Sequence, residues 1–323
     1  MTKIYQLGRA FTAVTLVQGT VHTARRHALN LIHLEQKLHL FVELDIQRWF
    51  MQFPRLMSCI NIIYSFIHIP GTILFLVLLY YYCVTSTRVS LSRPSSPVSP
   101  TRATSKPHAG PDLYASRRRT MGLSNLLAFV IFTAWPCMPP RLLSDPEYNG
   151  PAAQEARSYG FVDTVHGANG QSSVWTSNKF CNQFAAMPSL HFGYSLLVGM
   201  TTATLPLAAR YQGRRVPISF LGCRGSVYFP SLTRAVCVVL GLAYPTIIMV
   251  AIVSTANHFI LDAAAGAVVC AVAWRYNEVL LNFLPLEDWF LWCLRAHKVE
   301  TKPCETIKDR DNLRTNGKVV TPK

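Results

Sequence analysis

Long runs of apolar residues, separated by polar and basic segments, set the pattern along the chain. A helical run of about 18 residues or more can cross the hydrocarbon core of a bilayer. The pattern therefore predicts an all-α, polytopic membrane protein with about six transmembrane helices. The predicted spans are 10–24, 57–84, 121–138, 184–207, 235–255 and 258–281. The first span is short, and an interfacial helix or a signal-like segment is the alternative for it.

Residues 29–50 follow a different pattern, in which apolar positions recur at helical spacing between charged ones. This pattern predicts an amphipathic helix that lies on the membrane surface or against the bundle. The apolar positions are Leu31, Leu34, Leu38, Phe41, Val42 and Ile46, and the charged ones are Glu35, Lys37, Glu43, Asp45 and Arg48.

The membrane-embedded domain is expected to cover residues 29–284, after an N-terminal segment, 1–28, that holds the possible first span. Within it, residues 85–120 are dominated by Ser, Pro and Thr and carry many basic side chains. A segment of this composition cannot bury a core, so we expect a disordered cytosolic loop. Residues 285–323 are expected to form a basic cytosolic tail.

Composition agrees with a membrane protein, because 50% of the residues are hydrophobic and only 15% are charged. The net charge of +15 could indicate a nucleic-acid partner. The basic residues, however, lie in segments that flank apolar runs, as cytosolic loops do, so no nucleic-acid partner is expected. The nine cysteines are scattered singly, which argues against a disulfide framework or a structural zinc site.

Loop charges predict the side of the membrane on which each loop lies. Residues 141–182 carry slightly more acids than bases, whereas residues 208–234 carry five arginines and no acid. Because basic loops stay in the cytosol, the first of these loops is expected on the extracytoplasmic side. Six alternating spans then leave both termini in the cytosol.

Two histidines stand at the edges of apolar runs, each within a motif. His191 follows Pro188 and Ser189 at the mouth of one span, and His258 opens another span, four positions before Asp262. Residues four apart share one face of a helix, so His258 and Asp262 are expected to be neighbours. The predicted topology places both motifs on the extracytoplasmic side.

These side chains are the parts needed for phosphoryl transfer from a lipid. A neutral imidazole can attack phosphorus when a carboxylate holds its far nitrogen, which makes His258 the candidate nucleophile and Asp262 its partner. A second histidine can protonate the leaving oxygen, because the ordinary pKa of histidine lies near neutrality. His191 is the candidate for that role.

Phosphate oxygens need cationic or N–H donors, and Arg141 is the best-placed candidate because its planar fork matches them. Lys179 is a weaker candidate for the same pocket. Ser189 and the backbone N–H groups at the start of the following helix would add to anion binding. The predicted topology places Arg141 on the same side as the two histidines.

His68 is a secondary candidate near the middle of the second predicted span, where Pro70 and Gly71 predict a kink. It is either a functional intramembrane group or a histidine hydrogen-bonded inside the bundle. Asp163 is a further secondary candidate. Each catalytic histidine taken alone could be an interfacial residue that caps a helix, whereas the two motifs together favour catalysis. A zinc site of His191, His258 and Asp262 would lack a fourth ligand, so no metal is expected.

Residues 187–193 and the pattern His258-x-x-x-Asp262 resemble the second and third signature motifs of the type-2 phosphatidic acid phosphatase superfamily. More closely, they resemble its branch of fungal inositol phosphorylceramide synthases, the aureobasidin-resistance type of inositolphosphotransferase. The likeness covers about residues 28–284 and includes the segments 68–71, 139–143 and 160–164.

This resemblance implies a six-span helical bundle that works without a metal or other cofactor. It assigns the phosphohistidine to His258, its orientation to Asp262, and the acid–base role to His191. The implied substrate is a membrane lipid, such as phosphatidylinositol, ceramide or a lipid phosphate. The implied location is an endomembrane, Golgi or ER, with the active site on the lumenal face.

The chain departs from the superfamily pattern at three points. Leu190 replaces the glycine of the second motif, as the synthase-like branch allows, and Ile252 stands where the third motif has an arginine. The usual first motif is absent, and Pro139-Pro140-Arg141 is its substitute. The phosphate-binding part of the site is therefore the part for which the resemblance says least.

The family interpretation leaves two chemistries open. Water would discharge a phosphohistidine in a lipid phosphatase or an isoprenoid diphosphate phosphatase, whereas an alcohol such as ceramide would discharge it in a transferase. The resemblance favours the transferase. A catalytically inactive membrane scaffold, or a transporter that uses intramembrane histidines as a proton relay, is the alternative outside enzymology.

Overall fold

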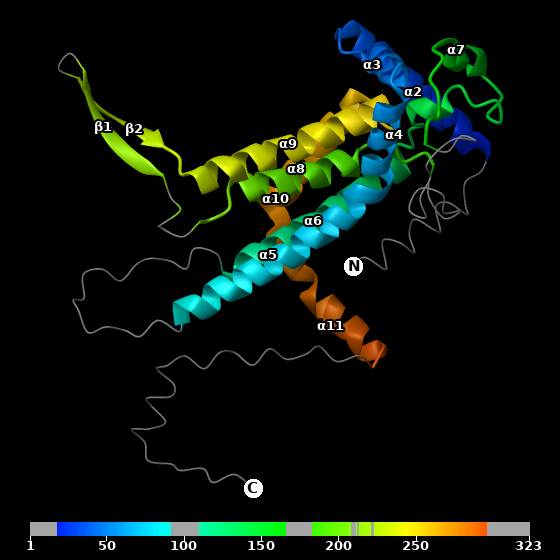
Figure 1. The fold of residues 1–323 in the computed structure, drawn as a ribbon. Coiled ribbons are helices and arrows are strands. Elements are labelled where there is room, and N and C mark those ends of the chain that lie inside the picture. Colours follow the sequence, from blue (N-terminus) through cyan, green and yellow to red (C-terminus); the bar gives the residue numbers. More distant parts are fainter. Residues whose placement is uncertain are drawn as a thin grey trace, which may run out of the picture. The chain divides into compact units, whose positions relative to one another are not determined.

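The computed structural model describes residues 18–91, 110–165, 183–207, 211, 213–220 and 223–295. Figure 1 shows the chain as helices with one two-stranded hairpin. It divides into two units, Met1–Glu278 and Val279–Lys323. The predicted catalytic histidines and their partners all belong to the first unit.

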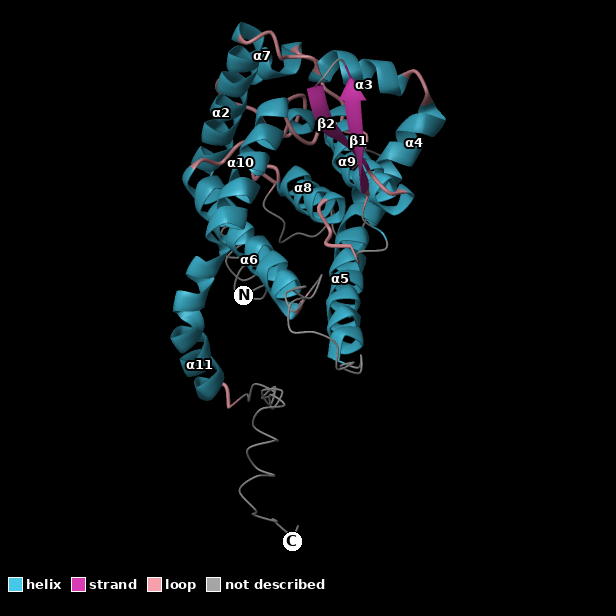
Figure 2. Cartoon of the chain, turned by 90° about the vertical axis from the view of Figure 1, so that its left-hand side faces the viewer, coloured by secondary structure: helices cyan, strands magenta, loops and turns pink. Residues whose placement is uncertain are grey.

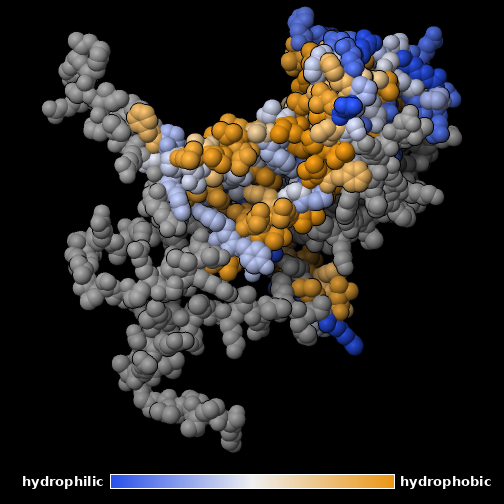
Figure 3. Space-filling view, in the orientation of Figure 1, coloured by the Kyte–Doolittle hydropathy of each residue, from blue (hydrophilic) through white to orange (hydrophobic). Residues whose placement is uncertain are grey.

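Among the residues that the structure describes, three helical stretches are long and apolar enough to cross a membrane: Pro54–Val84, Leu232–Ser254 and Ile260–Cys293. Large apolar side chains on the outside of these helices are exposed, and Figure 3 shows hydrophobic patches over the described helices on the face in view. Soluble proteins rarely expose apolar patches of this extent. The chain is therefore a membrane-embedded helical protein.

The first of these stretches is built from three consecutive helical segments, α4 (Pro54–Ile62), the π-helical turn η1 (Ile63–Ile67) and α5 (His68–Leu91). Pro70 has no N–H, so the carbonyl of Phe66 cannot receive the usual helical bond from it. The π-helical turn η1 contains this Phe66 carbonyl. The irregularity predicted around His68 thus lies just before it.

Two predicted spans differ in extent from the helices observed. Helix α6 (Pro111–Ala134) begins ten residues before the predicted span 121–138, and α8 (Leu190–Ala203) has only 14 residues. At 1.5 Å per residue, a helix of that length is about 21 Å long, less than the hydrocarbon thickness of about 30 Å. The prediction of a continuous helix over 184–207 is wrong, because residues 184–189 form a non-helical entry to α8.

The predicted disordered loop over 85–120 is also too long. Helix α5 continues to Leu91 and α6 begins at Pro111, so the three consecutive arginines at 117–119 are helical. Only residues 92–109 of that prediction lie outside the described part of the chain.

The predicted amphipathic helix over 29–50 is two helices, α2 (Gln18–Lys37) and α3 (Glu43–Met51). They meet at a turn in which His39 has a φ of 56°. The burial pattern is partly the reverse of the prediction, since Leu34 and Leu38 are exposed while Glu35 and Glu43 are fully buried. Of the predicted first span, residues 10–17 lie outside the described chain and residues 18–24 begin α2.

Helix α8 lies at the centre of the first unit, where it packs against α5, α6, α9 (Leu232–Ser254) and α10 (Ile260–Tyr276). Figure 2 shows it surrounded by these helices. The crossing of α8 and α9 depends on two glycines, because a Cβ at Gly199 would stand 2.2 Å from the carbonyl oxygen of Gly241. Helix α8 is therefore packed closely against α9 within the bundle.

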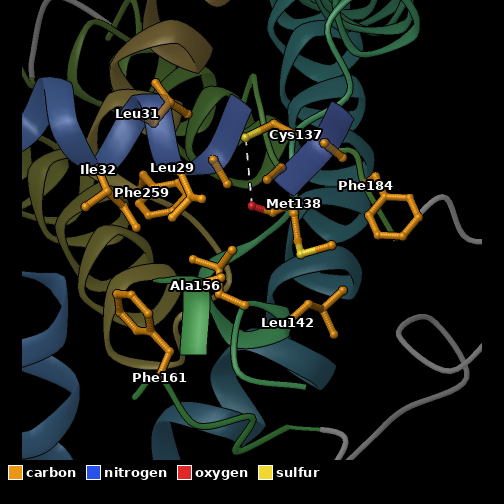
Figure 4. Close-up of a cluster of buried hydrophobic side chains, with 14 of the residues drawn as sticks. Leu29, Leu31, Ile32, Cys137, Met138, Leu142, Ala156, Phe161, Phe184 and Phe259 are labelled. Atoms are coloured by element: carbon orange, nitrogen blue, oxygen red, sulfur yellow. Dashed lines mark hydrogen bonds between the residues drawn. The ribbon is translucent and has the colours of Figure 1, made fainter. Parts of the chain in front are cut away.

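A cluster of buried apolar side chains joins α2 to the loops before α8 and α10, as Figure 4 shows. The 3₁₀ turn η2 (Pro140–Leu142) and the short helix α7 (Ala153–Ser158) also contribute to it. Phe259, which immediately follows His258, is completely buried in this cluster. The apolar core thereby fixes the position of the chain next to a predicted catalytic residue.

The antiparallel hairpin of β1 (Arg214–Phe220) and β2 (Cys223–Phe229) was not among the elements predicted from the sequence. Two runs rich in β-branched and aromatic residues, separated by Leu221 and Gly222, are the signal that was available. At the other end of the chain, η4 (Asn277–Phe283) leads to α11 (Leu284–Cys293). Helix α11 occupies the beginning of the predicted basic tail, of which residues 296–323 lie outside the described chain.

Candidate active site

The two predicted catalytic histidines lie at the starts of two neighbouring helices. His191 is the second residue of α8, whose N-cap is Ser189. His258 lies two residues before the start of α10, whose N-cap is Phe259. The spacing of His258 and Asp262 predicted that they share one face of a helix. This prediction is wrong, because His258 lies outside α10. His258 belongs to the entry loop, and Asp262 to the first turn.

The imidazole of His258 is held on both of its nitrogens. Nδ1 lies 2.8 Å from the backbone carbonyl oxygen of Ala186, and Nε2 lies 3.3 Å from Nδ1 of His191. A carbonyl oxygen can only accept a hydrogen bond, so Nδ1 of His258 carries the proton in the neutral ring. Nε2 is then left with its lone pair directed towards the second histidine.

Asp262 contacts His258 less directly than its spacing predicted. Its Oδ2 atom lies 3.7 Å from Nδ1 of His258, beyond hydrogen-bond distance. The same oxygen accepts a 2.9 Å hydrogen bond from the backbone N–H of Phe259. The fully buried Asp262 carboxylate thus caps its own helix and places negative charge beside the protonated nitrogen.

Two further carboxyl groups bind the start of α10. The backbone N–H of Ile260 donates to Oε1 of Glu43 at 3.0 Å, and that of Leu261 donates to Oε1 of Glu35 at 2.9 Å. Burial and the nearby Glu43 raise the pKa of the Glu35 carboxyl group to about 9. The first turn of α10 is consequently hydrogen-bonded to α2 and α3, in addition to its own cap by Asp262.

The starts of α8 and α10 also touch through their backbones. The N–H of Ser189 donates to the carbonyl oxygen of Asp262 at 2.9 Å. A Cβ at Gly266 would stand 2.2 Å from the carbonyl oxygen of Ser189. This close approach requires glycine, and it brings the His191 turn against the turn that follows His258.

Ser189 is completely buried, and its side chain serves the helix that it caps. Its Oγ atom accepts a 3.4 Å hydrogen bond from the N–H of Phe192. An N-cap of this kind satisfies one of the free N–H groups of the first turn. The hydroxyl therefore stands at the anion-favouring end of α8, beside His191.

Arg141, on η2, is buried beside the loop that leads to His258. Its guanidinium donates to three side chains, Asn257 Oδ1 at 3.0 Å, Asp163 Oδ2 at 2.7 Å and Gln183 Oε1 at 2.9 Å. Its backbone N–H donates to the carbonyl oxygen of Ala256 at 2.8 Å. These side-chain bonds use three of the five N–H donors of a guanidinium.

The loop that carries Asp163 is itself fixed by polar side chains from distant helices. Gln47 binds both the N–H and the carbonyl oxygen of Val162, at 3.1 and 2.8 Å. Asn61 donates to the carbonyl oxygen of Thr164 at 2.9 Å. The position of the Arg141 guanidinium therefore depends on α3 and α4.

His68 lies next to the predicted catalytic pair of His191 and His258. Its ring centroid is 5.2 Å from that of His191, and its Nδ1 atom lies 2.9 Å from the hydroxyl of Tyr244. Tyr64 packs against the same His191 ring, at a centroid distance of 4.9 Å. His191 is thus enclosed by His258 on one side and by the irregular α4–η1–α5 segment on the other. Lys179 lies outside the described residues.

Within the described ranges, no group of three or more His, Cys, Asp or Glu side chains is arranged to hold a metal ion. The zinc alternative considered for His191, His258 and Asp262 therefore gains no support from the geometry.

A family model described as the PAP2 superfamily matches residues 29–91, 108–212 and 226–276, which is more than half of the chain. The chain belongs to the PAP2 superfamily. Among curated proteins and among solved structures, none matches it significantly. Members of the PAP2 superfamily are generally phosphatases or phosphotransferases that act on lipid phosphates, which supports an enzyme of this type here.

The PAP2 match includes every described residue of the site. Sequence reasoning nevertheless missed several contributors, namely Ala186, Gln183, Asn257, Glu35 and Glu43. Gln183 and Asn257 stand close to the two motifs, so proximity alone could have suggested them. Ala186 contributes only a backbone carbonyl, which no sequence pattern marks. Glu35 and Glu43 were interpreted as part of a polar helix face, so nothing in the local sequence indicated that they belong to the site.

Proposed function

We propose that the protein is an integral membrane phosphotransferase or phosphatase that acts on a lipid head group through a phosphohistidine at His258. The observation that carries this proposal is the 3.3 Å contact between Nε2 of His258 and Nδ1 of His191, with the other His258 nitrogen bound to a carbonyl oxygen. Membership of the PAP2 superfamily supports the reaction class.

In the first step, the lone pair on Nε2 of His258 attacks the phosphorus atom of the lipid. The N–P bond forms as the P–O bond to the leaving alcohol breaks, and His191 gives a proton to the departing oxygen. The developing positive charge on the His258 ring is offset by the buried carboxylate of Asp262, 3.7 Å from Nδ1.

In the second step, an acceptor oxygen attacks the phosphorus atom while His191 takes its proton, and the N–P bond breaks. Water as acceptor makes the protein a phosphatase, and a lipid alcohol makes it a transferase. In both cases the histidines return to their initial protonation states.

Substrate entry requires the two rings to separate. A phosphorus atom about to be attacked lies about 3–3.5 Å from its nucleophile. His191 Nδ1 now occupies that position, because it lies 3.3 Å from Nε2 of His258. The His258 ring is held by the Ala186 carbonyl, so the His191 ring is the one that moves.

Arg141, Ser189 and Lys179 are proposed to bind the phosphate oxygens. For Arg141, the support is its burial beside Asn257, next to the nucleophile, with N–H donors beyond the three already engaged. For Ser189, it is the position at the start of α8, where the helix dipole favours an anion. Asp163 and His68 are proposed as secondary residues that hold Arg141 and His191.

The finer proposal is an inositolphosphotransferase-like enzyme that uses phosphatidylinositol as donor and ceramide as acceptor. The motif resemblance supports it, and a lipid phosphate or isoprenoid diphosphate phosphatase is the alternative. We further propose that α6, α8 together with the non-helical residues on either side of it, and the N-terminal segment complete six spans around the site. The protein would then lie in an endomembrane, Golgi or ER, with a lumenal site and cytosolic termini.

One assay separates these possibilities. Purified protein in detergent and EDTA is incubated with head-group-labelled phosphatidylinositol, with and without ceramide, and separately with labelled phosphatidic acid. A new phosphoinositol sphingolipid that depends on ceramide supports the transferase, whereas free phosphate from phosphatidic acid supports the phosphatase. Substrate flux in vesicles without either product would support the transporter instead, and no activity of either kind would support the scaffold.

His258→Ala and His191→Ala are the decisive variants. We expect His258→Ala to abolish turnover, and His191→Ala to lower it by about 10²–10⁴-fold, the usual contribution of acid–base catalysis. His33→Ala is the matched control, because His33 is an exposed histidine on α2 that binds Glu155. Near-normal turnover in either site variant would disprove the role given to that histidine.

A further inference from the structure

A buried pair of glutamates lies behind the nucleophile and takes no part in the chemistry described so far. Glu35 on α2 and Glu43 on α3 are both completely buried. Each uses Oε1 to bind one backbone N–H of the first turn of α10. Their Oε2 atoms have no hydrogen-bond partner within the described chain, and the two carboxyl groups lie close enough to interact with each other.

Two carboxyl oxygens can form a hydrogen bond only if one of them carries a proton. The surroundings favour that state. The facing titratable groups are Glu43 from α3, Asp262 from α10 and Cys137 from the segment after α6. Three ionised carboxyl groups at one buried helix start would repel one another, so burial and the neighbouring acids favour a proton on the pair.

A helix N-terminus ordinarily binds one carboxylate, through its free N–H groups and its dipole. The start of α10 instead receives three carboxyl groups, on three consecutive N–H groups from Phe259 to Leu261. Removal of the shared proton would place like charges on α2, α3 and α10 at their point of contact. The three elements would then be driven apart immediately after His258.

We propose that Glu35 and Glu43 are positioning residues for His258, acting as one acid–carboxylate pair whose shared proton holds the first turn of α10 against α2 and α3. The proposal rests on the proposed role of His258 as nucleophile. It predicts that the alignment of His258 with His191 is lost when the pair loses its proton.

The test measures kcat and KM between pH 6 and pH 10 for four variants and the wild type. The pKa of the Glu35 carboxyl group is raised to about 9. In the wild type, kcat is therefore expected to fall at alkaline pH, as the pair loses its proton. In Glu35→Gln and Glu43→Gln, the amide oxygen can still accept from the backbone N–H of α10, and the amide NH₂ can donate to the remaining glutamate. Both are expected to retain kcat at neutral pH and to lose the part of the alkaline fall that is due to the pair, while any fall due to deprotonation of His191 remains.

Glu35→Leu removes the acceptor of the Leu261 N–H and is expected to lower kcat by about 10–100-fold, the range typical of groups that orient a functional histidine. Its KM should change little, because the substrate does not touch Glu35. Asp45→Asn is the matched control, since Asp45 is an exposed acid on the same helix as Glu43. This control should reproduce the wild-type profile.

Hydrogen–deuterium exchange of residues 257–263 at pH 7 provides a measurement that does not depend on turnover. Glu35→Leu should speed exchange there, while Glu35→Gln and Asp45→Asn should not. An unchanged alkaline fall of kcat in Glu35→Gln, or unchanged exchange in Glu35→Leu, would overturn the proposal. If the wild type shows no turnover with any lipid, the proposed function fails, and the exchange data alone decide whether the pair positions this turn.

Discussion

Nδ1 of His258 lies 2.8 Å from the carbonyl oxygen of Ala186 and 3.7 Å from Oδ2 of Asp262. The backbone carbonyl is therefore the direct hydrogen-bond partner of this ring, and the carboxylate is its charged neighbour. The tautomer that leaves Nε2 unprotonated follows from the carbonyl alone. Asp262 caps α10, and we propose that it also stabilises positive charge on the His258 ring.

Replacement of Asp262 by Asn separates these two contributions. The Asn side chain can still accept the hydrogen bond from the N–H of Phe259, while the negative charge is lost. Because Ala186 still holds the ring, we expect kcat to fall by about 10–100-fold, as for other partners that support a functional histidine. The measurement is steady-state kinetics of Asp262→Asn beside His258→Ala, and equal losses in the two variants would contradict this division of roles.

Arg141 is expected to be intolerant even of lysine. One ammonium group cannot reach the three separate acceptors on Asn257, Asp163 and Gln183 that the guanidinium binds. We expect Arg141→Lys to lower kcat/KM by about 10²-fold or more.

Arg157→Lys is the control for this substitution, because Arg157 on α7 is half-buried and binds both of its hydrogen-bond acceptors through a single nitrogen. A wild-type kcat/KM in Arg141→Lys would show that the fork of hydrogen bonds does not serve catalysis.

A methyl group at Gly266 is expected to separate the two helix starts. It would meet the carbonyl oxygen of Ser189 at 2.2 Å, so the backbones of α8 and α10 would have to move apart. Overpacking of this kind costs about 1–3 kcal/mol, and the shift would also withdraw His191 from His258.

The temperature of thermal unfolding in detergent and the rate of turnover should therefore both be lower in Gly266→Ala than in the wild type. Gly71→Ala is the matched control, because a Cβ there would come no closer than 4.0 Å to the Tyr244 hydroxyl. Equal behaviour of the two variants would mean that the close approach at Gly266 is unimportant.

The stability of the protein should depend on pH through Glu35. Its ordinary pKa of 4.5 is raised to about 9 in the folded protein, so between these values the folded chain holds a proton that the unfolded chain releases. The free energy of unfolding consequently falls as the pH rises from about 4.5 to about 9.

Thermal unfolding of Glu35→Gln from pH 6 to pH 9 tests this expectation. Gln cannot ionise, so the decline with pH should be shallower than in the wild type. Parallel curves for the two proteins would show that Glu35 is not the group responsible.

The sequence by itself determined the class of the protein and the residues around which the candidate site is proposed. Apolar runs predicted a helical membrane protein, because the need to bury backbone hydrogen bonds in lipid leaves a strong local signal. The two histidine motifs were recognisable for a similar reason, since each is short and contiguous. Helix extents were predicted less well, because the end of an apolar run is not the end of a helix, as α8 shows.

Only the tertiary structure decided how the motifs are held. The partner of His258 is a backbone carbonyl 72 positions away, and every residue type carries such a carbonyl, so no sequence pattern marks it. Glu35 and Glu43 are buried although charged residues in an amphipathic pattern indicate a solvated face. Their burial is compensated by backbone N–H groups of α10, more than 200 positions later in the chain, and that compensation exists only once the helices have packed together.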